Sequence, residues 1–386
     1  MNVLFLTQFF STTRGGGEYL FNIMAKELLK NNHKVWVITN RIIGEEYQKN
    51  EAKLIFVKPD LEYKGGLPPK FLDNIRYSIN AIREGRKIIR NENIDIIHSN
   101  NFAPALAGSV LSFLTKKPHI TAIWDIFTLC GKDYWKKWVK QTGVSKIHEI
   151  VGPKFEKLIL KIPSNAIHTI SEATKEDLLN FGSKKPIHVI LPSIESVCKM
   201  DAELNPFQFV CIGRLVFYKN VEVLIRALVK IKKIEPKIKL IIIGGGPHIN
   251  VLKNLTDEHG LEHNIEFRGF VTEKEKMRII SESNSLLFPS LCEGFGLVIL
   301  EAFSQAKPVL VSNLRPMSEI VEHKNTGYVI DPQNETKWAD HILNLIKNPD
   351  ESKRMGNNGL SALETKYGRN RMYNKILEMY NDVLQK

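Results

Sequence analysis

Four charged residues in the second half of the chain stand where apolar runs end and helical patterns begin. Arg214 and Lys219 are five positions apart, and Glu293 and Glu301 are eight positions apart. Two cations at the edge of a sheet suit a diphosphate, whose negative charge grows as its bond to a sugar breaks. Glu293 could then reach sugar hydroxyls, and Glu301 could accept hydrogen bonds from a ribose. The alternative for Glu301 is a first-turn residue that the helix dipole favours.

Three glycine-rich segments accompany these charges. They are Gly15-Gly16-Gly17, Gly244-Gly245-Gly246-Pro247 and Gly294-Phe295-Gly296-Leu297. The first segment opens a helical pattern, so its backbone N–H groups could hold an anion. Dinucleotide enzymes use the same device, but they place an acidic residue at the end of the second strand, where this chain has Asn40. A turn needed only for tight packing is the alternative for the first two segments.

Short runs rich in Val and Ile alternate with helical patterns along the whole chain, which is typical of parallel sheets joined by crossover helices. The predicted strands are residues 3–7, 34–39, 53–57, 94–98, 119–124, 166–170 and 187–191, then 207–212, 239–243, 264–267, 285–288, 308–311 and 328–330. Helical patterns include 17–30, 73–91, 337–345 and 369–384. Ligands of such sheets bind at the carboxyl ends of the strands, where the charged residues lie.

The polar segment 195–206 shows neither the alternation typical of a strand nor the period of a helix, and it separates the two series of strands. We predict an α/β fold with two doubly wound, Rossmann-like domains. The predicted first domain covers residues 1–197, and the predicted second domain covers residues 198–368. A C-terminal helix at 369–386 can pack back on the first domain.

The composition of the chain indicates where the protein acts and what kind of partner it binds. Four scattered cysteines indicate neither a disulfide framework nor a zinc site and favour a reducing cytoplasm. The weakly polar stretch 102–114 is shorter than the roughly 20 residues that cross a bilayer. Residues 1–197 hold 28 basic and 19 acidic residues, and so supply most of the net charge of +12. This excess indicates an anionic partner or a solvated Lys-rich surface, and no motif beside it favours nucleic acid.

Motifs along the whole chain resemble those of the family-4 retaining glycosyltransferases of the GT-B fold, the group 1 glycosyl transferases. Gly15-Gly16-Gly17-Glu18 resembles the family's GGxE loop, and Gly213-Arg214-Leu215 with Lys219 resembles its GRL…K element. The 244–247 loop is similar to GxGP, 267–271 to FxGxV, and 293–301 to the EGFGL…E motif. The resemblance implies two Rossmann-like domains that face each other across a cleft holding the donor. It further implies that residues 1–197 form the acceptor-side domain and residues 198–368 the nucleotide-sugar-binding domain.

The resemblance also implies roles for single residues. Arg214 and Lys219 would hold the diphosphate, Glu293 the donor sugar and Glu301 the ribose. No Asp-x-Asp is present, so no metal and no cofactor are expected. In similar enzymes the acceptor hydroxyl enters on the face that the diphosphate leaves, and the departing phosphate takes its proton. The implied set is Arg214, Lys219 and Glu293 as catalytic residues, and Gly16, Gly17, Gly246, Phe270, Phe295, Gly296, Leu297 and Glu301 as donor-binding residues.

Three acceptor-side candidates lie in the first domain, namely His98, Trp124 and Asp125. Trp124-Asp125 stands where the family usually has a His-Asp pair. An indole cannot accept a hydrogen bond or carry positive charge. It could instead form a stacking wall for sugar or acceptor. The alternative for His98 is a strand-end histidine satisfied by backbone groups.

These residues predict retaining transfer of a hexose or N-acetylhexosamine from a nucleoside-diphosphate sugar to a hydroxyl of a glycan or glycolipid, in glycolipid, surface polysaccharide or glycoconjugate synthesis. Two alternatives stay open: a non-hydrolysing sugar-nucleotide epimerase, and a catalytically silent partner subunit. The expected location is cytoplasmic and peripheral to the membrane.

Residues 132–161 interleave Tyr134, Trp135, Trp138 and Val139 with lysines. Basic residues beside exposed aromatic rings can rest on anionic lipid. A helix whose aromatic rings pack on its own domain is the alternative.

Overall fold

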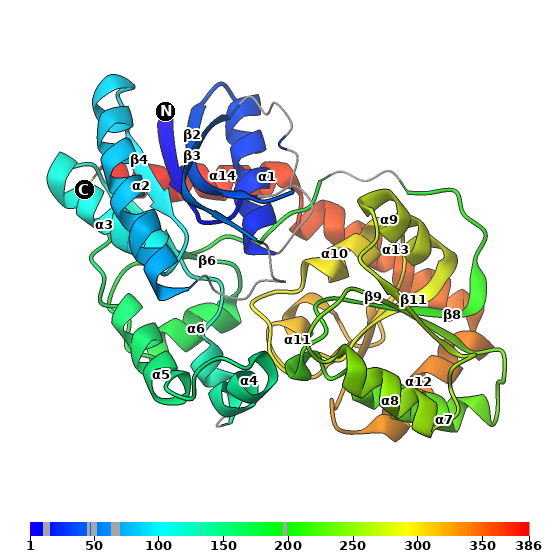
Figure 1. Cartoon of the computed structure of the whole chain (residues 1–386). Coiled ribbons are helices and arrows are strands. Elements are labelled where there is room, and N and C mark those ends of the chain that lie inside the picture. The colour runs from blue at the N-terminus through cyan, green and yellow to red at the C-terminus, as the bar shows by residue number, and fades with distance from the viewer. Residues whose placement is uncertain are drawn as a thin grey trace. The chain divides into compact units, whose positions relative to one another are not determined.

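The structure is a computed structural model that describes residues 1–10, 16–44, 47, 52–62, 70–131, 133–195 and 199–385, apart from the side chain of Glu18. It divides into two compact units. Unit 1 consists of Met1–Ile126, Gly152–Ser193 and Arg369–Lys386, and unit 2 of Phe127–Val151 and Ile194–Gly368. Each unit is built around a parallel sheet, so the predicted α/β class is confirmed (Figure 1).

Unit 1 contains a seven-stranded parallel sheet of order β3-β2-β1-β4-β5-β6-β7. Its strands are β1 (Asn2–Leu6), β2 (Lys34–Ile42), β3 (Lys53–Leu61), β4 (Ile96–Ser99), β5 (His119–Ala122), β6 (Ala166–Thr169) and β7 (Ile187–Val189). Its helices are α1 (Gly17–Lys30), α2 (Phe71–Asn91), α3 (Ala103–Thr115), α6 (Glu172–Asn180) and α14 (Arg369–Leu384), and α5 (His148–Ile159) spans the division between the units. All seven strands predicted in this half are present.

Alternation along β1 explains why helices cover both faces of this sheet. Leu4 and Leu6 are fully buried in a cluster with Tyr77 of α2 and Leu111 of α3. Phe5 points to the other face, where its ring lies 5.2 Å from that of Phe21 in α1. Both faces of β1 are therefore core.

Helix α14 packs against α1 and belongs to unit 1, although it is last in the chain (Figure 1). Arg369 pairs with Glu27 of α1, whose side chain is fully buried. Tyr373 and Tyr380 hydrogen-bond His33 and His98 at 2.9 Å each. A buried carboxylate needs a partner, so α14 completes the core of unit 1.

Unit 2 contains a six-stranded parallel sheet of order β10-β9-β8-β11-β12-β13. Its strands are β8 (Asn205–Ile212), β9 (Lys239–Ile243), β10 (Ile265–Gly269), β11 (Ser283–Phe288), β12 (Val309–Ser312) and β13 (Gly327–Ile330). Its helices are α4 (Tyr134–Thr142), α7 (Val221–Lys232), α8 (Ile249–Glu258), α9 (Glu273–Glu282), α10 (Leu297–Ser304), α11 (Met317–Ile320), α12 (Glu335–Lys347) and α13 (Pro349–Lys366), with short 3-10 turns η1 (Phe127–Leu129) and η2 (Phe217–Lys219). The six predicted strands are again present.

The predicted domain limits of 1–197 and 198–368 differ from this division in the placement of one segment. Residues 127–151 lie in unit 2, although the chain places them between β5 and β6 of unit 1. The predicted boundary itself falls in 196–198, outside the described residues.

Among the described residues, no helix combines the length and apolar character needed to cross a bilayer.

An aromatic cluster fixes the 127–151 segment to unit 2. Tyr134 of α4 is buried with Val216, Tyr218 and Cys292, and Trp135 and Trp138 pack at its edge. The backbone N–H of Phe217 also donates to the Gln141 side chain at 3.2 Å. Tyr134 therefore belongs to the protein core and Trp135 and Trp138 are partly buried, so the lipid contact predicted for this helix stays a prediction. Lys132 lies outside the described residues.

The structure also corrects the prediction for the cysteines. Cys130 and Cys292 form a disulfide with Cα atoms 5.4 Å apart, and Cys211 is buried and free. The bridge joins the end of η1 to the residue before Glu293. The sequence spacing of 162 residues carried no sign of this pairing.

We predict that reduction of the Cys130–Cys292 bridge lowers the free energy of unfolding by about 2–4 kcal/mol, because the bridge restricts a long loop in the unfolded chain. Urea unfolding of the same protein with and without dithiothreitol measures the change. The Cys130→Ser/Cys292→Ser double variant is the control and should not respond to the reductant. Equal midpoints for the wild type in both buffers would contradict the prediction.

Candidate functional site

Four loops of unit 2 meet at one edge of its sheet because all six strands are parallel. The loops follow β8, β9, β10 and β11, and they lead into η2, α8, α9 and α10. Every unit 2 residue predicted to bind a donor lies in one of these loops or in the first turns of the next helix.

Glycines let the loops after β8 and β9 touch backbone to backbone. A Cβ on Gly244 would lie 2.0 Å from the carbonyl oxygen of Gly213, and one on Gly246 would lie 2.3 Å from that of Leu215. Leu215 N–H also donates to the carbonyl of Gly245 at 2.9 Å. Tight packing therefore accounts for Gly244 and Gly246, and a direct contact of Gly246 with a donor stays a prediction.

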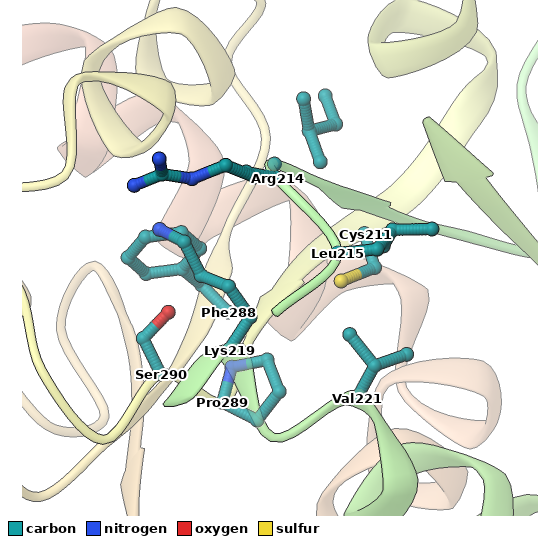
Figure 2. A pocket seen from close by; sticks show the side chains of 10 residues that line it. Cys211, Arg214, Leu215, Lys219, Val221, Phe288, Pro289 and Ser290 are labelled. Carbon is teal, nitrogen blue, oxygen red and sulfur yellow. The ribbon is translucent and has the colours of Figure 1, made fainter. Parts of the chain in front are cut away.

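Lys219 and Glu293 form an ion pair across the loops after β8 and β11. Only 15% of the lysine and 14% of the glutamate side chain are exposed. A pocket beside the pair is lined by Arg214, Lys219, Phe288 and Ser290, among others. Figure 2 shows the cationic ends of Arg214 and Lys219 on the same side of this pocket, with the lysine next to the Phe288 ring. The sequence thus correctly placed three of the charged residues at one edge.

The Arg214 guanidinium is oriented by an aromatic neighbour. Its Nη2 donates a 2.6 Å hydrogen bond to the hydroxyl of Tyr218. Tyr218 in turn is buried against Tyr134 of α4, and its carbonyl accepts from Leu291 N–H at 2.7 Å. The 127–151 segment therefore supports the loops that carry Arg214 and Glu293.

Glu301 pairs with a lysine that the sequence analysis did not single out. The Nζ of Lys276 in α9 lies 2.9 Å from Glu301 Oε1 and 2.8 Å from Glu273 Oε2. Burial raises the pKa of the Glu301 carboxyl above its ordinary value, and the Lys276 ammonium opposes that shift. Burial acts to lower the pKa of Lys276, but the two carboxylates outweigh it and raise this pKa.

The loop after β11 ends in a backbone conformation that favours glycine. Gly296 is the N-cap of α10 with φ of 103°, and a Cβ there would lie 3.0 Å from the Phe288 ring. Phe295 is buried, and its ring lies 5.8 Å from that of Tyr367. The ring of Phe295 therefore packs inside unit 2, and its predicted donor contact is through the backbone. Leu297 is the first residue of α10.

Phe270 presents a bare aromatic ring at the same edge. Its side chain is 79% exposed, the highest value among the large apolar residues described. Its ring atoms come within 3.0 Å of the position that a Cβ on Gly245 would take. A flat exposed ring at this edge can stack with a nucleobase.

The structure buries His98 in unit 1 and so corrects its prediction as an acceptor-side residue. His98 has no exposed surface, and its two ring nitrogens contact Tyr380 at 2.9 Å and His168 at 3.3 Å. Burial, and then the neighbouring His168 and His119, lower the pKa of His98 well below its ordinary value. Side chains, rather than the predicted backbone groups, satisfy this histidine.

Trp124 is also packed inside unit 1, with 8% of its surface exposed. Its ring meets Phe21 and His168 edge to face, at 6.0 and 4.9 Å. Its Nε1 lies 2.7 Å from the position of a Cβ on Gly17, which explains the glycine at the start of α1. The backbone carbonyl of Trp124 accepts a 3.2 Å hydrogen bond from Thr174. An indole so placed is core, not the open stacking wall predicted.

The remaining unit 1 candidates lie close by. Gly16 is the exposed N-cap of α1. Asp125 is half-buried and follows Trp124 directly. Gly15 and the Glu18 side chain lie outside the described residues. Roles for Gly16, Gly17 and Asp125 stay predictions.

Two family models match almost the whole chain. The model for Glycosyltransferase Family 4 matches residues 14–196, and the model for Glycosyl transferases group 1 matches residues 198–361. The second match contains Arg214, Lys219, Glu293 and Glu301.

Three proteins are similar to this chain over nearly their full length. N-acetyl-alpha-D-glucosaminyl L-malate synthase of Bacillus anthracis is 26% identical over 96% of this chain and 95% of its own. Sucrose-phosphate synthase of Thermosynechococcus elongatus has a TM-score of 0.82 at 17% identity, covering 100% of this chain and 99% of its own. Anabaena HepE, solved with UDP-glucose, has a TM-score of 0.76 at 17% identity, covering 99% and 100%.

With both family models matched in sequence order and two parallel α/β sheets shared with these structures, the chain belongs to the family-4, group 1 glycosyltransferases of the GT-B fold.

Proposed function

We propose that this glycosyltransferase moves a hexose or N-acetylhexosamine from a nucleoside-diphosphate sugar to a hydroxyl of a glycan or glycolipid, with retention and without a metal cofactor. The observation that carries the proposal is the gathering of three cations and two carboxylates at one edge of unit 2. Lys219 pairs with Glu293, Lys276 pairs with Glu301, and Arg214 shares the pocket of Lys219.

A donor would replace both partners of the Lys219–Glu293 pair. Its diphosphate takes the ammonium of Lys219, and its sugar hydroxyls donate to the carboxylate of Glu293. Neither charge is left without a partner, so the exchange avoids the cost of an unpaired buried charge. The ion pair thus keeps both side chains in place for the donor.

Negative charge develops on the leaving diphosphate, and Arg214 and Lys219 would stabilise it. Cations already in place stabilise such charge without reorganisation during the reaction. The acceptor hydroxyl attacks the anomeric carbon on the face that the diphosphate leaves. Its proton passes to the departing phosphate oxygen, so no protein nucleophile is required.

The names of two related proteins support the proposed classes of donor and acceptor. The Bacillus anthracis protein is named for an N-acetylglucosaminyl group joined to malate, whose hydroxyl is the obvious acceptor. HepE was solved with UDP-glucose. The first agrees with a hydroxyl acceptor for this chain, and the second agrees with a sugar nucleotide as donor.

We predict that Glu301→Ala weakens binding of the nucleoside diphosphate alone about 10-fold or more, because a hydrogen bond to a charged group contributes about 1.5–3 kcal/mol. Glu293→Ala should leave that affinity nearly unchanged and lower turnover, because it contacts the sugar. Calorimetry with uridine, guanosine and adenosine diphosphates first identifies the base and then compares the variants. Unchanged affinity in Glu301→Ala would refute the ribose role, and normal turnover in Glu293→Ala would refute the sugar role.

Analysis of the reaction products distinguishes the proposed transferase from two other functions that the same fold could have. An epimerase would convert the donor alone into a changed nucleotide sugar, which NMR of the donor with enzyme detects. A silent partner subunit would bind the donor and form no product with any acceptor.

The predicted cytoplasmic location, peripheral to the membrane, also stays a prediction.

Within the segment 132–161, which the sequence predicts to contact lipid, α5 has the more exposed apolar side chains. Ile147, Ile150 and Leu158 are 57–65% exposed along α5 and the residue before it. Exposed Lys154 and Lys157 lie on the same helix. Apolar side chains beside ammonium groups suit the headgroup region of an anionic bilayer. We propose α5 as the membrane contact.

The Ile150→Gln/Leu158→Gln variant should lose most of its sedimentation with vesicles of phosphatidylglycerol and phosphatidylcholine. The wild type should sediment with them at low salt, and less at high salt or with phosphatidylcholine alone. Ile234→Gln, an equally exposed isoleucine in unit 2, is the matched control. Sedimentation equal for all three proteins would exclude α5.

Trp124→His should leave transfer near the wild-type rate, because the buried indole forms core rather than a group that reacts with sugar. Trp124→Ala should instead lower the free energy of unfolding by about 3–5 kcal/mol. Product formation and thermal unfolding measure the two effects. Transfer found only in Trp124→His would identify the natural chain as the silent partner subunit.

A further inference from the structure

Lys276 carries a buried charge whose partners include the residue proposed to bind the ribose. Its side chain is 13% exposed, and Glu301 is 16% exposed. Removing a lysine from water is unfavourable unless carboxylates compensate the charge. Glu301 and Glu273 supply two, at 2.9 and 2.8 Å.

The pair leaves one carboxylate oxygen available. Lys276 contacts Oε1 of Glu301, and Oε2 accepts no hydrogen bond from the described residues. A carboxylate held at one oxygen keeps a fixed direction for the other. Two neighbouring hydroxyls, such as those of a ribose, could donate to that oxygen.

Lys276 also ties this carboxylate to the loop after β10. Helix α9 begins three residues after Phe270, and its N-cap Thr272 accepts from Glu275 N–H at 3.2 Å. Lys276 lies in the first turns of α9 and reaches across to α10. Movement of the Phe270 loop would therefore move the ammonium that holds Glu301.

We propose that Lys276 is a positioning residue for nucleotide recognition, which clamps Glu301 Oε1 so that the ionised carboxylate presents Oε2 to the ribose hydroxyls. This role rests on the proposed function, since it requires a nucleotide donor. The pKa effects agree with it: burial raises the pKa of Glu301, and Lys276 counteracts this and so favours the accepting form. Glu273 pairs with the same ammonium and compensates its charge as well.

The test compares a nucleoside diphosphate with its 2′,3′-dideoxy form by calorimetry, using the base that binds the wild type. The wild type should prefer the ribose form about 10-fold or more, because dideoxy ligands lose the hydrogen bonds to a charged group. Lys276→Met should reduce the preference below about threefold while dideoxy affinity stays within about twofold of wild type. Lys276→Arg should restore most of the preference, because it returns a cation to the site.

Arg278→Met is the matched control on the same helix, because Arg278 is exposed and pairs with Glu282 at the surface. It should keep the wild-type preference. In the Lys276→Met/Glu301→Gln double variant the loss should equal that of Glu301→Gln alone, since both act on one interaction.

Four results would overturn the role. Lys276→Met could keep the full ribose preference, or it could lose affinity equally for both ligands, which marks a purely structural residue. A wild type that binds both ligands equally would refute ribose recognition by Glu301 itself. A wild type that binds no nucleoside diphosphate would instead refute the proposed function, and this role with it.

Discussion

Two lysine–glutamate pairs, whose side chains are 13–16% exposed, hold the edge of unit 2 together. Lys219 reaches from the loop after β8 to Glu293 after β11, and these strands are neighbours in the sheet. Lys276 reaches from α9 to Glu301 in α10, two helices that pack against each other. Charges with so little access to water must keep their partners. Each pair therefore fixes the position of the loops that carry it.

Backbone contact makes these short side-chain distances possible. The loops after β8 and β9 approach so closely that only glycine fits at 244 and 246. From the other side, Tyr134 of α4 and the Cys130–Cys292 bridge support η2 and the residue before Glu293. The candidate site is thus enclosed by a segment that the chain supplies between two strands of unit 1.

Local patterns were sufficient to predict the elements of the fold. All thirteen strands were found, and α1 and α14 have the predicted bounds, because alternation, helical period and glycine punctuation are visible within a few residues. Lys276 and the cysteine pairing were missed because they depend on which distant segments meet. The packing of the α4 aromatic rings could not be predicted for the same reason, since the same pattern of aromatic and basic residues is compatible with contact to lipid and with packing on the protein.

Two unit 1 candidates, His98 and Trp124, are buried in the core, whereas the charged unit 2 candidates lie at the sheet edge, and the cost of burial explains the difference. His98 and Trp124 lie on the sheet face of Phe5, which α1 and, from the far end of the chain, α14 cover. A neutral imidazole needs few partners inside a core, and an indole fewer still. Arginine, lysine and glutamate must keep water or an opposite charge. A charged motif residue at a strand end is therefore held near a surface by its own solvation, whereas a neutral one is placed by whatever packs over it.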